Sequence, residues 1–168
     1  MKTIASVLLA VCLSMQAKSP VPRAAGDFPV VDASGKSKKL SDFKGQVVLV
    51  QFLYTTCQHC QATARMLSGL QKDLKGLQVV GVAFEPGVTS EAIERFKVAN
   101  AVNFPVSSAA TEAVQNYLGI SVMERFVVPQ ILIIDRKGTV RAQSEPMGSP
   151  ELQDEGQLRS LLGSLLAK

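Results

Sequence analysis

Three apolar runs of strand length stand out along the chain, at residues 47–54, 77–84 and 130–135. Each contains mainly valine, isoleucine, leucine and phenylalanine without regular polar alternation, a pattern typical of strands that are buried on both faces. Over residues 60–75, between the first two runs, apolar residues recur at helical spacing. A helix there can cross over from the first strand to a parallel second strand, so we expect an α/β fold with a central sheet.

Shorter elements are expected on either side of this centre. They are two short strands joined by a turn over residues 28–40, a helical turn over residues 41–45, helices over residues 91–99, 111–118 and 153–166, and a strand over residues 139–143. Ser90 is expected to cap the first of these helices, because serine is a preferred N-cap residue. The last strand follows the third apolar run after a tight turn, so it should pair back antiparallel. The sequence therefore predicts a mixed sheet flanked by helices, preceded by an N-terminal β-hairpin extension.

The first 17 residues differ in pattern from the rest of the chain. They contain an apolar run over residues 4–13 followed by small and polar residues, which is the layout of a secretory signal. A lipoprotein signal ending at Cys12 and an uncleaved membrane anchor are the alternatives, and all three would export the domain to a periplasmic or other extracytoplasmic compartment. We expect residues 1–17 to be a signal peptide or anchor, residues 18–25 a linker and residues 26–168 one domain.

Charge and cysteine content exclude several classes of function. The formal net charge is +4, and the chain has no tryptophan and only two tyrosines. Because basic and aromatic residues do not interleave, we expect no nucleic-acid partner. His59 is the only histidine, and Cys12 lies in the expected signal, so the four ligands of a structural zinc site are missing and no metal is expected. We expect the domain to be a monomer.

The other two cysteines, Cys57 and Cys60, lie where the first apolar run ends and the helix begins. A helix N-terminus carries unpaired N–H groups and a partial positive charge, which stabilise a thiolate and lower its pKa. Cys57 faces that charge and is expected to be the nucleophile. Cys60 lies one helical turn later and can resolve a mixed disulfide by attacking Cys57. This spacing predicts a redox-active disulfide.

From about residue 26 onward, the chain resembles the thioredoxin superfamily, in particular the exported, AhpC/TSA-like redoxins of the TlpA/ResA type. The segments that carry the resemblance are the hairpin around Asp27-Phe28, the Cys57-Gln-His-Cys60 motif after a buried strand, Asn103-Phe-Pro-Val106, and Val128-Pro129 before the third apolar run. The resemblance implies a thioredoxin-like fold and an enzyme, a thiol–disulfide oxidoreductase that exchanges electrons with protein cysteines. It also implies no cofactor beyond the cysteine pair, and a membrane thiol-transfer protein as a partner.

The resemblance assigns roles to the residues around the proline. In the family, the proline that corresponds to Pro129 forms a cis peptide bond and packs against the two sulfurs. The backbone of the preceding residue, here Val128, pairs with the substrate as an added strand. Thr56 stands where relatives usually carry tryptophan, and Gln130 where they carry threonine. We therefore expect Val128, Thr56 and Gln130 to be substrate-binding residues.

Two further residues bear on proton and electron transfer. Gln51 takes the place of a buried acid that moves a proton to the second cysteine in thioredoxin, and Glu85, at the end of the neighbouring strand, is the best substitute. His59, directly before Cys60, has the placement found in strongly oxidising members, where a donor or cation favours the reduced dithiol. Because relatives of the TlpA/ResA type mostly reduce, the direction of electron flow stays open.

Two other functions compete with thiol–disulfide exchange. A peroxiredoxin-like thiol peroxidase, which is an antioxidant, shares this fold. Its active site requires proline seven and threonine or serine three residues before the reactive cysteine, where this chain has Val50 and Tyr54. A Sco-like copper-handling protein spaces its cysteines one residue wider and adds a distant histidine. Thiol–disulfide exchange is therefore the leading hypothesis.

Overall fold

The computed structural model describes residues 21–32 and 34–167. Its strands are β1 (Arg23–Ala24), β2 (Pro29–Val31), β3 (Ser37–Lys39), β4 (Val47–Leu53), β5 (Leu77–Ala83), β6 (Val106–Ser108), β7 (Gln130–Ile134) and β8 (Thr139–Gln143). Its helices are α1 (Gln58–Asp73), α2 (Ser90–Ala99), α3 (Thr111–Leu118) and α4 (Glu155–Leu166), with short 3₁₀ helices η1 (Leu40–Phe43) and η2 (Pro150–Leu152). In this part of the chain, β1, β8, β7, β4, β5 and β6 form one sheet in that order, and β2 and β3 form a separate hairpin. The expected mixed sheet, flanking helices and N-terminal hairpin are confirmed.

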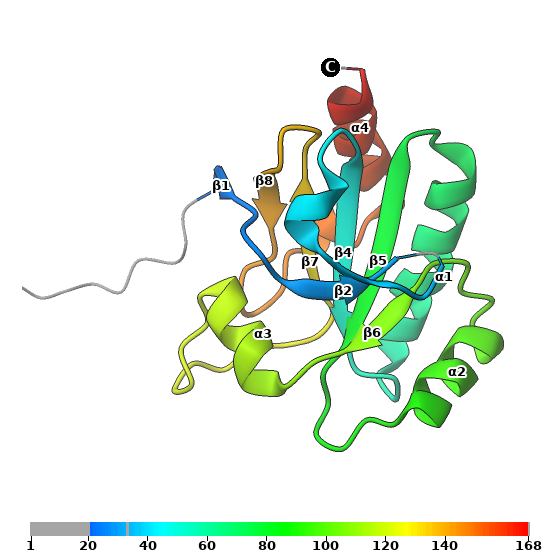
Figure 1. Cartoon of the computed structure of the whole chain (residues 1–168), viewed down its shortest axis with the longest axis vertical. Coiled ribbons are helices and arrows are strands. Elements are labelled where there is room, and N and C mark those ends of the chain that lie inside the picture. Colours follow the sequence, from blue (N-terminus) through cyan, green and yellow to red (C-terminus); the bar gives the residue numbers. More distant parts are fainter. Residues whose placement is uncertain (1–20, 33, 168) are drawn as a thin grey trace, which may run out of the picture.

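Strand β4 lies at the centre of the sheet and is buried along its whole length. It pairs parallel to β5, with Val50 opposite Val80, and antiparallel to β7, with Val50 opposite Leu132. Helices α1, α2 and α4 cover one face of the sheet, while the β2–β3 hairpin, η1 and α3 cover the other (Figure 1). Two covered faces explain why the apolar runs show no alternation.

This topology brings three distant segments to one end of the sheet. The parallel strands β4 and β5 both end there, and β7 begins there, with Gln130 opposite Phe52. The β7–β8 turn and the C-terminal end of α4 lie at the opposite end, at the top of Figure 1. The segments that follow β4 and β5 therefore meet the segment that precedes β7, at the strand ends where α/β proteins place their sites.

The sheet begins earlier in the chain than the expected domain start at residue 26. Strand β1 falls within the linker expected over residues 18–25, and it pairs antiparallel with β8. A two-residue strand has no periodicity, so only its partner reveals it. The expected signal segment, with its alternative at Cys12, lies outside the described residues. Within the described ranges, no helix is long and apolar enough to span a membrane.

Besides α1, which begins at Gln58 rather than at residue 60, two helices start differently from the sequence prediction. Thr89, rather than Ser90, caps α2, because Thr89 has the extended backbone of an N-cap and its hydroxyl accepts a hydrogen bond from Ala92 N at 3.2 Å. Helix α4 begins only after Asp154, whose side chain caps its first turn. Neither difference moves the elements that converge at the strand ends.

Candidate active site

The two cysteines occupy the junction of β4 and α1. Cys57 N donates a hydrogen bond to Tyr54 O at 3.2 Å, which turns the chain after the strand. Cys57 is the N-cap of α1, and its sulfur accepts a hydrogen bond from Cys60 N at 3.3 Å. This N–H is one of the unpaired donors of the first turn, so it stabilises negative charge on the Cys57 sulfur.

The environments of the two free thiols differ strongly. Cys57 is half-buried, whereas Cys60 is fully buried against the core on the α1 side of the sheet. Burial raises the pKa of the Cys60 thiol well above its usual range, and a hydrogen bond with Cys57 and the negative charges of Cys57 and Glu85 raise it further. Cys60 is therefore a thiol at neutral pH, and it must lose a proton before it can act as a nucleophile.

The proline loop reaches the cysteines from far along the chain. The Val128–Pro129 peptide bond is cis, as expected, and Pro129 is buried. The Cys57 thiol donates to Val128 O, with the sulfur 3.8 Å from that oxygen. The Val128 N–H has no hydrogen-bond partner within residues 21–32 and 34–167. A backbone donor next to the half-buried Cys57 is thus free to pair with an incoming chain.

Glu85 follows β5 and contacts the segment between β4 and α1. Its Oε1 accepts hydrogen bonds from both Thr55 N, at 2.8 Å, and the Thr55 hydroxyl. Its Oε2 is buried and has no partner among the described residues. Burial, followed by the charge of Glu85, also raises the pKa of Tyr54.

Thr55 is a site residue that the sequence analysis missed. It is buried, and its carbonyl accepts a hydrogen bond from Gln61 Nε2 at 3.1 Å. Nothing in the pattern around Thr55 distinguishes it from its neighbour Thr56, which is exposed beside Cys57. Only the pairing of β4 with β5 shows that Thr55 faces Glu85.

The other residues predicted for the site lie at different depths. Gln51 is fully buried, and its Nε2 donates to Cys60 O at 2.9 Å, so a neutral amide contacts the backbone of the second cysteine. His59 is exposed in the first turn of α1. The Gln130 side chain is fully buried and lies behind the proline loop rather than on its outer surface.

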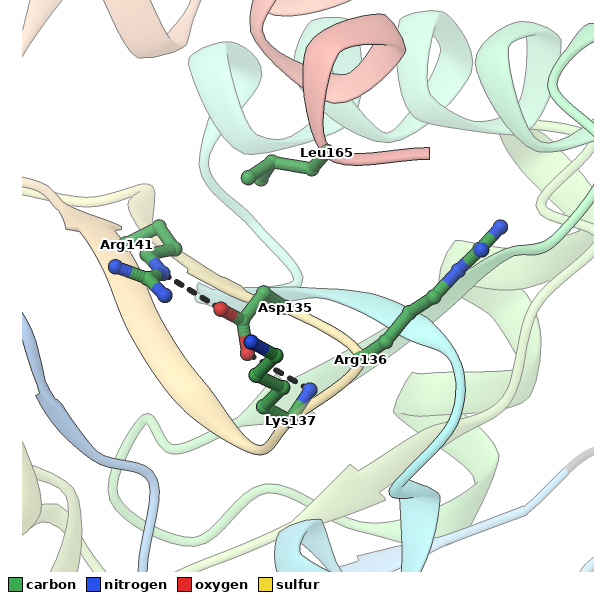
Figure 2. A pocket seen from close by; sticks show the side chains of 5 residues that line it. All are labelled: Asp135, Arg136, Lys137, Arg141 and Leu165. Carbon is green, nitrogen blue, oxygen red and sulfur yellow. Dashed lines mark hydrogen bonds and ion pairs between the residues drawn. The ribbon is translucent and has the colours of Figure 1, made fainter. Parts of the chain in front are cut away.

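A separate cavity of about 230 Å³ lies at the opposite end of the sheet. Its lining comprises Asp135, Arg136, Lys137, Arg141 and Leu165, as Figure 2 shows. Arg141 and the backbone N–H of Lys137 hold the Asp135 carboxylate, while the Arg136 side chain points away from it. These contacts close the β7–β8 turn, and they lie far from the cysteines.

A sequence comparison identifies the family from residues 21–143, which match the model of the AhpC/TSA family. The chain belongs to the AhpC/TSA family. Within the thioredoxin superfamily it is a redoxin of the ResA type. The match begins at residue 21, so it includes β1.

Relatives and solved structures agree with this placement. The thiol-disulfide oxidoreductase ResA of Bacillus cereus is 28% identical over 128 residues, covering 76% of this chain and 70% of the relative. ResA of Bacillus subtilis is 34% identical over 82 residues, which is 49% of this chain and 46% of the relative. A thioredoxin-family thiol:disulfide interchange protein from Chlorobium tepidum superposes with a TM-score of 0.67 at 20% identity, covering 88% of this redoxin and 99% of that chain. This last likeness shows the thioredoxin fold.

Proposed function

We propose that this redoxin is an exported thiol–disulfide oxidoreductase that exchanges electrons with protein cysteines through the Cys57–Cys60 pair. The enzyme class is the one named for its ResA relatives. One observation carries the proposal: a half-exposed thiol caps α1 with Val128 O 3.8 Å away, and a second, buried thiol lies behind it. In this proposal Cys57 is the nucleophile, the backbone of Val128 is the edge along which a substrate chain binds, and Cys60 is the resolving group.

The reaction consists of two exchanges. The Cys57 thiolate attacks one sulfur of a substrate disulfide, and the substrate's other sulfur leaves as a thiolate. Cys60 then loses its proton and attacks the Cys57 sulfur, which forms the Cys57–Cys60 disulfide and releases the first substrate sulfur as a thiolate. The substrate gains two electrons and the cysteine pair loses two. The reverse sequence oxidises a substrate dithiol.

Glu85 is proposed as the proton acceptor for Cys60. Its Oε1 is held by two donors of Thr55, whereas its buried Oε2 is free of partners in the described ranges. A carboxylate in this position can accept the Cys60 proton, and the carboxylic acid can later return it. Gln51 cannot play this part, because an amide does not titrate.

The substrate is proposed to lie along the proline loop. The N–H and C=O of Val128 face an incoming chain in the manner of an edge strand, so backbone hydrogen bonds would hold it in register beside Cys57. Thr56 would lie beside the bound substrate chain, and its small side chain leaves the Cys57 sulfur accessible. Exposed His59 would act on Cys57 through its charge, by stabilising the thiolate when the imidazole is protonated.

We propose that the domain works outside the cytoplasm, with residues 1–17 as signal or anchor. Residues 18–22 would then connect it to β1, the first strand of the redoxin fold. An exported dithiol needs electrons from inside the cell, so its reductant would be a membrane thiol-transfer protein. Fusing residues 1–25 to a reporter that is active only after export tests the location. Full reporter activity inside the cytoplasm would contradict it.

The decisive test of the function uses single cysteine variants. Cys60→Ser should accumulate mixed disulfides with a disulfide-bonded protein substrate, because the resolving thiol is gone, and Cys57→Ser should lose all activity. The measurement is turnover of the substrate, with trapped adducts identified by mass spectrometry. Normal turnover by the Cys60→Ser variant would refute the resolving role of Cys60.

Peroxide reduction is the second candidate, and the name of the matched family is the observation that favours it. Val50 is buried in β4, and the Tyr54 ring packs on Phe84 with centroids 4.8 Å apart. Neither residue supplies the proline and short hydroxyl that a peroxidatic cysteine uses. Peroxide consumption by the Cys60→Ser variant at the wild-type rate would favour this candidate over disulfide exchange.

A further inference from the structure

Gln61 links the first turn of α1 to the turn that precedes the helix. It directly follows Cys60, and its backbone N–H donates to Cys57 O at 3.0 Å, which fixes its place in the helix. Its side chain is half-buried, and Nε2 donates to Thr55 O at 3.1 Å. The carbonyl of Thr55 is therefore held by the residue next to the buried cysteine.

Thr55 uses its polar groups on two partners. Its N–H, at 2.8 Å, and its hydroxyl both donate to Glu85 Oε1, while its carbonyl accepts from Gln61. The residue is only 8% exposed, so water has little access to these bonds. A β-branched side chain also has few rotamers, which limits the directions in which the hydroxyl can point. Gln61, Thr55 and Glu85 thus form one chain of hydrogen bonds from α1 to the segment that follows β5.

These hydrogen bonds distinguish the two carboxylate oxygens of Glu85. Oε1 receives both donors of Thr55, whereas Oε2 is buried and has no partner among residues 21–32 and 34–167. A carboxylate on a free side chain can exchange its oxygens, because the last torsion of glutamate is broad. Two donors on one oxygen oppose this rotation, so the other oxygen is the one left to receive a proton.

We propose that Gln61 and Thr55 are positioning residues for the resolving step, which hold Glu85 so that Oε2 is the atom that receives the Cys60 proton. The proposal rests on the proposed function. In this step the Cys60 proton passes to Oε2, the Cys60 thiolate forms a bond with the Cys57 sulfur, and the substrate sulfur leaves with the electron pair of the broken bond. Because α1 carries both Cys60 and Gln61, the acceptor is fixed relative to the thiol that it serves.

The first test changes the Thr55 hydroxyl and follows the two exchanges separately, in a single turnover with a disulfide-bonded peptide. Thr55→Val keeps the shape of the side chain and removes the donor, so resolution should slow about tenfold, a part of the contribution of a general base. Attack by Cys57 should stay within about twofold, because that exchange needs no proton acceptor. Thr55→Ser keeps the hydroxyl and should restore resolution to within about threefold of wild type.

Two comparisons separate positioning from general damage to the fold. A protein that has only lost stability should slow in both exchanges, since less of it is folded, whereas loss of positioning slows resolution alone. Thr139→Val is the matched control, because Thr139 begins β8 at the end of the sheet opposite to the cysteines. This variant should alter neither rate.

The second test removes the amide of Gln61. Gln61→Leu should slow resolution about fivefold, the effect of one hydrogen bond, and leave attack by Cys57 unchanged. In a protein that already carries Glu85→Gln, the same change should have no further effect, because the group that it positions no longer accepts a proton. Gln157→Leu, which changes an exposed glutamine of α4, is the control and should leave resolution unchanged.

The outcomes separate the positioning roles from the proposed function. If the wild-type protein does not reduce the peptide, the proposed function itself is refuted. If it does and Glu85→Gln leaves resolution unchanged, Glu85 is not the acceptor and the positioning roles fall with it. If Glu85→Gln slows resolution but Thr55→Val and Gln61→Leu do not, the positioning roles are refuted and disulfide exchange stands. A variant that slows resolution equally with and without Glu85→Gln would refute the role of its own residue.

Discussion

At the scale of single residues, the proposed second half of the reaction depends on one carboxylate, Glu85. Burial keeps Cys60 a neutral thiol, so it needs a proton acceptor before it can act as a nucleophile. Glu85 follows the adjacent strand β5, and Thr55 holds one of its carboxylate oxygens. In the proposed mechanism the same charge has two opposite effects: it raises the pKa of Cys60, and it offers a site for the proton.

Replacing Glu85 separates these two effects. If Glu85 accepts the proton, Glu85→Gln should slow resolution of the mixed disulfide by about a hundredfold at neutral pH, within the range of general base catalysis. The defect should shrink at alkaline pH, where hydroxide can deprotonate Cys60. If the charge only repels the thiolate, the variant should resolve faster than wild type. Stopped-flow measurement of resolution against pH decides, with Glu112→Gln on the exposed side of α3 as the control.

At the scale of elements, the β7–β8 hairpin depends on the Asp135 carboxylate. Asp135 accepts hydrogen bonds from Lys137 N at 2.9 Å and Arg141 Nε at 2.6 Å, which Figure 2 shows, and from Thr139 N at 3.0 Å. Burial on its own would raise the pKa of Asp135, but these donors outweigh it and hold the pKa below its usual range. The hairpin aligns β7, and the N-terminal end of β7 carries the proline loop.

Asp135→Asn should destabilise the protein by about 1–3 kcal/mol at neutral pH, because the replacement removes a charged acceptor that three donors share. Because the pKa of Asp135 is lowered in the folded state, the stability that its carboxylate contributes depends on pH. It is fully present above the unfolded-state pKa of about 3.9, and it is lost as pH falls through the lower folded-state pKa. Urea unfolding of both proteins at pH 7 and pH 3 measures the difference. A gap of equal size at both pH values would contradict the assigned role of the carboxylate.

At the scale of the whole molecule, the N-terminal strand joins the sheet to α3. Arg23 lies over the Tyr117 ring, 5.1 Å from its centroid, and the Tyr117 hydroxyl donates to Ala25 O at 2.8 Å. The same ring packs against Phe28 and Phe52, with centroids 4.7 and 6.1 Å away. Arg23 and Ala25, which precede the expected domain start at residue 26, therefore contact α3, and Ala25 is part of the core.

A chain that starts at Gly26 should be less stable than one that starts at Val21. Loss of β1 and the Arg23 contacts should cost about 2 kcal/mol, which lowers the melting temperature by about 5–8 °C for a domain of this size. Thermal unfolding of the two purified domains gives the comparison. The rate at which iodoacetamide modifies Cys57 should be equal in both, since β1 does not contact the cysteines. Equal melting temperatures of the two chains would contradict the stabilising role of β1 and would favour a linker role for residues 18–25.

Much of this arrangement was predictable from local pattern. Buried parallel strands leave continuous apolar runs, and α1 leaves a helical repeat, so the order of the main elements and the position of Cys57 could be read along the chain. The pairing of β1 with β8, the Thr89 cap and the Thr55 contact with Glu85 could not. Each of these features depends either on a partner that is distant in sequence or on a backbone angle. Distant partners and backbone angles leave no periodic pattern in the sequence.

The sequence by itself determined which residues can do chemistry: a thiol pair at the end of a buried strand, and a proline before another. The reason is that hydrophobic burial and helix capping depend on a few neighbouring residues, so the local sequence pattern indicates them. Only the tertiary structure decided which groups surround that pair. Parallel pairing of β4 with β5 brings Glu85 to Thr55, and antiparallel pairing of β4 with β7 brings Val128 to Cys57. Such contacts arise from sheet register, which no single segment of the chain encodes.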